Sequence, residues 1–188
     1  MSFTTQAQTF KAGAIIGLNA AQIRGDASAG FNKLGIMGGL RVAVEVSEKV
    51  DLSLEMLYSQ RGSFQQVTNN NPEEFRITTD YIDVPVAFNY RDWLVEEGYY
   101  RIHFHAGLSY GRLINSGTDD INLNAVVENF NENDISWLAG TSYYFNENLA
   151  LTARYTRSVN LLFEGPGTGT NSNSFLGFFL TFHVLYMF

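Results

Sequence analysis

Hydrophobic and polar residues alternate one by one along much of this chain. The clearest example begins at Val50, where every second residue up to Tyr58 is apolar. The residues between them include the polar Asp51, Ser53 and Glu55. A repeat of two indicates β-strands, because an amphipathic helix repeats its apolar residues every three or four positions. Similar segments predict eight strands, at about 10–19, 34–46, 50–59, 79–90, 99–112, 134–145, 149–159 and 174–188.

The connections between these segments alternate in length. Long polar stretches lie at about 22–33, 61–76 and 115–133, and a glycine-rich stretch lies at 165–171. Between them are tight turns at 47–49 and 146–148 and a somewhat longer turn at 91–98. Long loops at one end and short turns at the other are expected of an outer-membrane barrel, whose short turns are periplasmic. The pattern predicts an all-β fold, an eight-stranded antiparallel up-and-down transmembrane β-barrel, with periplasmic termini and extracellular long loops.

The composition is compatible with a membrane-embedded barrel. The mean hydropathy is near neutral at −0.09, and no stretch approaches the roughly 18 apolar residues of a membrane helix. A barrel can have near-neutral hydropathy and still be embedded in a membrane, because lipid-facing and lumen-facing residues alternate along each strand. The absence of cysteine excludes disulfides and cysteine-ligated metals, and the net charge of −7 argues against a nucleic-acid partner. No cofactor or metal is expected, and outer-membrane lipid is the expected partner, with other outer-membrane proteins as further candidates.

The first residues differ in character from the rest. Residues 1–9 contain neither a basic segment nor an apolar segment of the kind that directs export. The Thr-Gln-Ala sequence at 5–7 is similar to the end of a signal-peptide cleavage site. We therefore interpret residues 1–9 as a residual signal-cleavage region and residues 10–188 as a single barrel domain.

Aromatic residues gather at the predicted short-turn end. Amphipathic rings favour the level of the lipid headgroups, so these residues are expected to form a girdle there. The alternative is the aromatic core of a soluble β-sandwich, which would not need its rings at one end of the strands. The predicted girdle consists of Tyr90, Trp93, Tyr99, Tyr100, Tyr143, Phe145, Tyr186 and Phe188.

The lumen of an eight-stranded barrel is just wide enough to be filled by side chains. Buried charges there should be paired or hydrogen-bonded, because an isolated buried charge is very costly. Glycines such as Gly39, Gly107 and Gly140 are expected to make room for bulky lumen residues. The predicted polar network of the lumen consists of Arg41, Glu45, Asp51, Glu55, Asp83, Arg101, His103, His105 and Arg154.

The histidines and acidic residues also suggest two other kinds of site, catalytic and cation-binding. His103 and His105 share a face with Ser109, and some barrel enzymes that act on lipids use a histidine and a serine. No second motif supports a catalytic triad here, so no catalytic residues are predicted. The Asp119-Asp120 pair could contact a divalent cation, but a solvated acidic loop is favoured. Pro85, in the middle of a strand, should interrupt the ladder locally because it lacks a donor.

Four short motifs carry a family resemblance. They are Leu-Tyr-Ser-Gln-Arg-Gly at 57–62, Tyr-Ile-Asp-Val-Pro-Val at 81–86, Ala-Gly-Leu-Ser-Tyr-Gly at 106–111 and Arg-Tyr-Thr at 154–156. In order and spacing, they resemble the outer-membrane β-barrel domain family of Bacteroidota, often called PorT-like. The resemblance implies an eight-stranded barrel in a Gram-negative bacterium and makes Pro85 a family trait. Some relatives are linked to type IX secretion and gliding, and the family supplies no catalytic residues.

The expected function is that of a non-enzymatic integral outer-membrane barrel. It would serve as a subunit or accessory of a larger assembly for secretion, such as type IX, or for nutrient uptake. Three alternatives stay open: a small-solute pore, a lipocalin-like soluble carrier and a lipid-modifying barrel enzyme. The carrier would need its apolar face inside, whereas here one face of the strands holds many charged residues.

Overall fold

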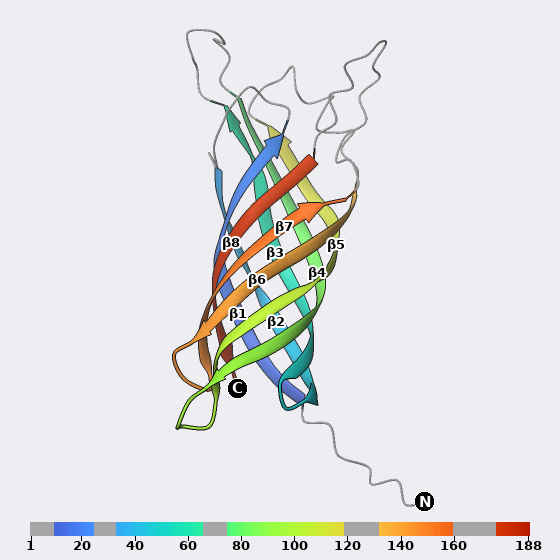
Figure 1. The fold of residues 1–188 in the computed structure, drawn as a ribbon. Coiled ribbons are helices and arrows are strands. Elements are labelled where there is room, and N and C mark those ends of the chain that lie inside the picture. Colours follow the sequence, from blue (N-terminus) through green and yellow to red (C-terminus); the bar gives the residue numbers. More distant parts are fainter. Residues whose placement is uncertain (1–9, 25–32, 66–74, 119–131, 160–175) are drawn as a thin grey trace, which may run out of the picture.

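The computed structural model describes residues 10–24, 33–65, 75–118, 132–159 and 176–188. These residues form a closed barrel in which each strand pairs antiparallel with its neighbours in the sequence and β1 pairs with β8 (Figure 1). No helix in these ranges is long and apolar enough to cross a membrane. The predicted eight-stranded antiparallel barrel is confirmed. The strands are β1 Phe10–Arg24, β2 Lys33–Ser47, β3 Val50–Gln65, β4 Phe75–Leu94, β5 Tyr100–Thr118, β6 Asn133–Tyr144, β7 Leu149–Ser158 and β8 Leu176–Met187.

Several strands are longer than the alternation predicted. The sequence assigned 61–76 and 115–133 to loops, but β3 continues to Gln65 and β5 to Thr118. Backbone pairing persists beyond the apolar band, where both faces of a strand are polar and the alternation gives no signal. β4 and β5 remain paired as far as Ile77 and Thr118, whereas β5 and β6 pair only up to Arg112 and Asn133. The wall formed by β3, β4 and β5 therefore rises above the rest of the barrel (Figure 1).

The connections between the strands distinguish the two ends of the barrel. The turns after β2, β4 and β6 lie at one end, together with the start of β1 and the end of β8 (Figure 1). We call this the short-turn end. The opposite end, where the chain leaves β1, β3, β5 and β7, is called the loop end. Residues 1–9, interpreted above as a signal-cleavage remnant, lie outside the described residues.

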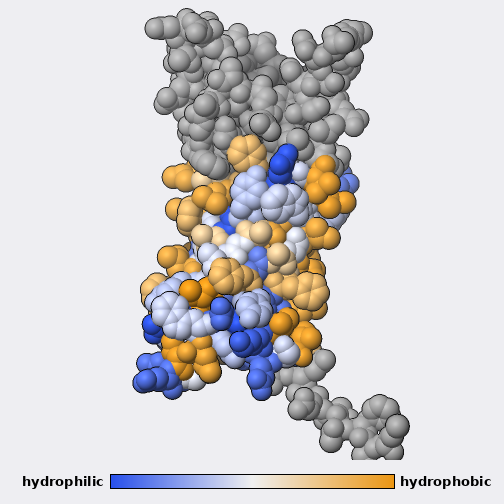
Figure 2. All heavy atoms as spheres, in the orientation of Figure 1, coloured by the Kyte–Doolittle hydropathy of each residue, from blue (hydrophilic) through white to orange (hydrophobic). Residues whose placement is uncertain are grey.

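The outer face of the barrel is apolar and the inner face is polar. Along β6 exposed and buried residues alternate for most of its length. Leu40 and Leu108 are each 62% exposed on the outside, while Glu55 on the inner face is 2% exposed. Figure 2 shows hydrophobic side chains over much of the barrel wall. Apolar surface on this scale is not found on water-soluble monomers, so the wall is built to face hydrocarbon.

Two inward-facing glycines allow neighbouring strands to approach closely. A Cβ on Gly39 would lie 2.0 Å from the backbone oxygen of Met56, and one on Gly107 would lie 2.0 Å from that of Val86. The expectation that these glycines make room for bulky lumen side chains is therefore wrong, because the obstacle is backbone. Of Gly39, Gly107 and Gly140, only Gly140 also meets a lumen side chain, since its Cβ would lie 2.6 Å from His105 Nε2. Such close contacts let a small barrel curve tightly.

Pro85 interrupts one of its two ladders. The pairing of β3 with β4 passes from Leu54–Val86 to Leu57–Asp83 without pairs between them. On the other side, Pro85 remains opposite Ser109 of β5. Because the register is the same before and after the gap, the missing proline donor removes hydrogen bonds without shifting the strands.

Substitution of Leu40 tests which surface meets lipid. Leu40 lies at the middle of β2 with its side chain outside. We expect Leu40→Arg to destabilise the barrel by about 2–4 kcal/mol in phospholipid vesicles, because a cation near the bilayer midplane is poorly solvated. Val46→Arg, near the end of the same strand, is the control and should cost about 0–1 kcal/mol. Unfolding by guanidinium chloride measures both, and equal effects at the two positions would contradict the assignment.

Candidate functional site

An ion pair crosses the centre of the lumen. Alternation directs Glu55 of β3 and Arg154 of β7 inward, and closure of the barrel brings these strands face to face. Arg154 Nη1 and Nη2 donate to Glu55 Oε2 and Oε1 at 2.7 and 2.8 Å, and Arg154 Nε donates to His105 Nε2 at 3.2 Å. Both charged side chains are almost fully buried. This two-pronged geometry is the strongest form of an arginine–carboxylate pair. We call Glu55 and Arg154 the central pair.

Further ion pairs run from the central pair to the short-turn end. Arg41 lies 3.6 Å from Glu55 and 3.5 Å from Asp51. Asp51 also accepts hydrogen bonds from Asn89 at 2.7 Å and from Arg91 at 3.0 Å. Arg91 Nη1 then contacts Glu45 at 3.0 Å. Each buried carboxylate on this path therefore has a cation within reach, as its desolvation requires.

A second layer of charge closes the lumen nearer the loop end. Arg61 of β3 donates to Asp134 of β6 at 2.8 Å and to Asp83 of β4 at 2.5 Å. Its guanidinium carbon lies 4.6 Å from the ring centroid of Tyr81 and 4.2 Å from that of Phe179. The cation is thus held by two carboxylates and two aromatic faces. We call Arg61, Asp83 and Asp134 the upper plug.

The sequence pattern predicts a long loop at Arg61. This prediction is wrong, because β3 continues through Arg61 and directs its side chain into the upper plug. Extending the alternation by one step beyond Ser59 would have directed Arg61 inward, and Asp134 likewise falls on the inward face of its strand. The signal was therefore present but was obscured by the polar residues around Arg61. Other lumen residues that the analysis missed include Asn19, Asn89, Tyr81, Tyr144 and His183, all buried.

Seven of the nine residues assigned to the lumen network are buried inside the barrel. They are Arg41, Asp51, Glu55, Asp83, His103, His105 and Arg154. Glu45 is partly exposed at the short-turn end, where it contacts Lys11 at 3.1 Å. Arg101 lies outside the network, because the lumen ends at the first residues of β5. Its guanidinium carbon is 5.6 Å from the ring centroid of Trp93, a residue with a positive φ of 58°.

His103 and His105 each contact lumen groups other than Ser109. His103 Nε2 lies 3.2 Å from the backbone oxygen of Tyr100, and its ring is 4.1 Å from that of Tyr144. His105 contacts Arg154 and lies four residues from Ser109, which corresponds to about 13 Å along a strand. No group of three or more histidine, aspartate or glutamate residues in the described part could hold a metal. The Asp119-Asp120 pair lies outside the described residues.

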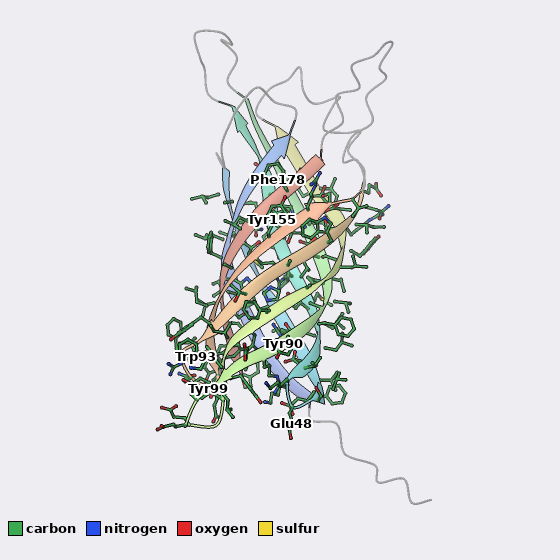
Figure 3. The ribbon with its side chains drawn as sticks, in the orientation of Figure 1. Glu48, Tyr90, Trp93, Tyr99, Tyr155 and Phe178 are labelled. Carbon is green, nitrogen blue, oxygen red and sulfur yellow. The ribbon has the colours of Figure 1, made fainter. Side chains whose placement is uncertain are left out.

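Aromatic side chains gather at both ends of the outer wall. Tyr90 and Trp93 lie toward the short-turn end, and Tyr99 lies at the same end (Figure 3) but is half-buried and packs against the buried core. Tyr155 and Phe178 lie toward the loop end (Figure 3), in a group that the sequence did not predict. Trp137 packs against Tyr155 with ring centroids 5.4 Å apart. Of the other girdle residues, Tyr143, Phe145, Tyr186 and Phe188 are exposed, and Tyr100 is half-buried.

A cavity opens between the central pair and the short-turn end. It has a volume of about 290 Å³ and is lined by both charged and aromatic residues. Arg41, Arg91, Asp51 and Tyr144 are among them. We call this cavity the vestibule. A second void of about 20 Å³ lies between the central pair and the upper plug, and this is too small to connect them into a channel.

Removing one member of the central pair should be far more harmful than removing both. We expect Arg154→Met to destabilise the folded barrel by about 3–5 kcal/mol, because Glu55 would lose its two short hydrogen bonds in a buried site. The double variant Glu55→Leu with Arg154→Met should recover much of this loss. Denaturant unfolding of both single variants and the double variant in detergent measures the coupling. Simple addition of the two single effects would show that the pair is not coupled.

Two solved structures with TM-scores above 0.5 share this fold at low sequence identity. The attachment invasion locus protein Ail of Yersinia pestis, solved in complex with the heparin analogue sucrose octasulfate, has a TM-score of 0.52 and 12% identity, over 95% of this chain and 99% of that one. A second structure of Ail has a TM-score of 0.53 and 11% identity, over 95% and 98%. Neisserial surface protein A has a TM-score of 0.47 and 12% identity, over 97% and 100%.

No curated protein is significantly similar to this chain in sequence. The family model for the outer membrane protein beta-barrel domain, in contrast, matches residues 6–164. This match covers most of the chain and agrees with the closed barrel, the apolar wall and the charged lumen described above. The chain therefore belongs to the outer membrane protein beta-barrel domain family, whose place is the bacterial outer membrane.

Proposed function

We propose that this protein is a non-conducting, non-enzymatic barrel that acts as a subunit or accessory of a larger outer-membrane assembly. The filled lumen is the observation that supports a non-conducting barrel. The central pair and the upper plug each cross the barrel with short, buried ion pairs. Opening a path would require desolvated charges to separate, which is strongly unfavourable.

Two alternative functions have less support. A lipid-modifying enzyme would need His103 or His105 beside Ser109, and neither contacts it. A lipocalin-like carrier would need an apolar interior, whereas this lumen holds the central pair and the outer wall carries leucines. A small-solute pore is the remaining competitor, and it is opposed by the same ion pairs that fill the lumen.

The raised wall supports a role in an assembly. At the loop end, β3, β4 and β5 extend beyond the other strands as a three-stranded sheet. Asp80 in this sheet accepts hydrogen bonds from Tyr58 at 2.9 Å and from Asn115 at 3.0 Å, which ties the three strands together. Within the described residues, β5 beyond Leu113 pairs only with β4. Such a sheet offers a firm surface and a strand edge to a protein partner.

The orientation and the kind of assembly are also part of the proposal. In outer-membrane barrels the short turns face the periplasm, which would put both termini there and the raised wall outside the cell. The resemblance of the Tyr-Ile-Asp-Val-Pro and neighbouring motifs to PorT-like proteins of Bacteroidota is the basis for the choice of assembly. That choice is a secretion machine, such as the type IX system, or a nutrient-uptake complex.

Conductance measurements separate this proposal from a pore. We expect the purified protein to give no stepwise currents in planar lipid bilayers, because both layers of charge block the lumen. The variant with Arg61→Ala and Arg154→Ala should leak small ions, since water can then hydrate the remaining carboxylates. Regular current steps from the unmodified protein would contradict the proposal.

Crosslinking tests the raised wall as a contact surface. A Cβ at Gly117 of β5 would meet nothing within 4 Å, so a photoreactive phenylalanine analogue fits there without disturbing the described residues. We expect this position to give a discrete protein adduct in native membranes. The same analogue at Leu108, on the lipid-facing part of β5, is the matched control and should give lipid adducts. Protein adducts absent from both positions would contradict the assembly role.

A further inference from the structure

The vestibule contains an arginine with unused hydrogen-bonding capacity. Arg41 is 4% exposed and lines this cavity. A guanidinium has five N–H donors, yet within the described residues the only hydrogen bond from Arg41 is the 3.5 Å contact of Nη2 with Asp51. Its Nε has no partner at all among the described atoms. Buried donors without partners are rare, and each calls for an explanation.

The carboxylates near Arg41 are already bound more closely by other groups. Glu55 accepts both of its short hydrogen bonds from Arg154. Asp51 is held by Asn89 at 2.7 Å and by Arg91 at 3.0 Å. The two distances from Arg41 to these carboxylates, 3.5 and 3.6 Å, are the longest of the buried ion pairs. Among the described residues, Arg41 is therefore the lumen cation whose neighbouring carboxylates are both bound more closely by other groups.

Besides Arg41, the charged residues that line the vestibule are Lys11, Arg91, Glu45, Asp51 and Glu147. Glu45 lies 3.1 Å from Lys11 and 3.0 Å from Arg91, and it forms the rim of the cavity with them. The remaining lining includes apolar and aromatic surface: Tyr99, Tyr100, Tyr144 and Met187. The ring of Tyr144 lies 4.1 Å from that of His103. The vestibule thus combines one under-bonded cation with flat apolar walls.

We propose that the vestibule binds a small organic anion that carries one carboxylate and one aromatic ring. The carboxylate would bind the guanidinium of Arg41, which is the best-matched partner for a carboxylate. The ring would lie against Tyr144 and its apolar neighbours. A cavity of about 290 Å³ is close to the lower limit of ligand pockets, so the ligand is small. The site opens toward the short-turn end and does not depend on the proposed role in an assembly.

Calorimetric titration of the full-length protein in detergent tests the site with 3-phenylpropionate as the probe. We expect saturable binding, with at least about tenfold weaker binding of the neutral 3-phenylpropanamide and of acetate. The amide lacks the charge and acetate lacks the ring, so together they separate the two halves of the site. Equal heats for the acid and the amide would indicate partition into detergent and would overturn the proposal, as would the absence of saturation.

Two variants locate the binding. Arg41→Gln removes the cation but leaves Glu55 with Arg154 and Asp51 with Arg91, so the barrel should still fold. Ala43→Leu fills the vestibule, which Ala43 lines, and leaves every charge in place. We expect each to weaken 3-phenylpropionate binding by at least about tenfold. Arg112→Gln, on the outer face of β5 at the other end of the barrel, is the control and should bind normally. Unchanged binding in Ala43→Leu would place the probe elsewhere and overturn the site.

Discussion

The ion pair between Glu55 and Arg154 is the interaction on which the inside of this barrel depends. It lies at the middle of a lumen too narrow for a column of water, so neither charge can be solvated in any other way. Arg41, Asp51 and Arg91 extend it toward the short-turn end. Nearer the loop end, Arg61 is likewise buried against groups that stabilise its charge, two carboxylates and two aromatic rings. The lumen is filled by charged side chains that contact groups of opposite charge, and this allows a polar interior to coexist with an apolar wall.

The sequence predicted the faces of the strands better than their ends. Alternation decides which side chains point inward, and this depends only on neighbours along the chain, so Glu55, Asp83 and Arg154 were assigned correctly to one face. The end of a strand depends on hydrogen bonds to its neighbours, which the chain does not display. Arg61 was therefore placed in a loop, although β3 continues beyond it. The same limit explains Arg101, which has the inward alternation but lies where the lumen ends.

Partners across the lumen were beyond the reach of the sequence. Glu55 and Arg154 lie on β3 and β7, which are not adjacent, and no spacing along the chain indicates that they meet. The under-bonded state of Arg41 was equally invisible, because it follows from Glu55 and Asp51 being taken by other residues. The close strand contacts at Gly39 and Gly107 could not be predicted from the sequence either. They arise from the curvature of a closed sheet, whereas composition shows only that glycine is frequent.

The separation of the central pair along the chain has a consequence for how the molecule is made. Glu55 and Arg154 are 99 residues apart, so their bond forms only when nearly the whole sheet has been synthesised and curled. In an incomplete sheet each of these charges would lie unpaired in an apolar environment, so partly assembled forms would be unstable. The final seam between β1 and β8 should therefore form together with this bond in one concerted step, and maturation should be all-or-none.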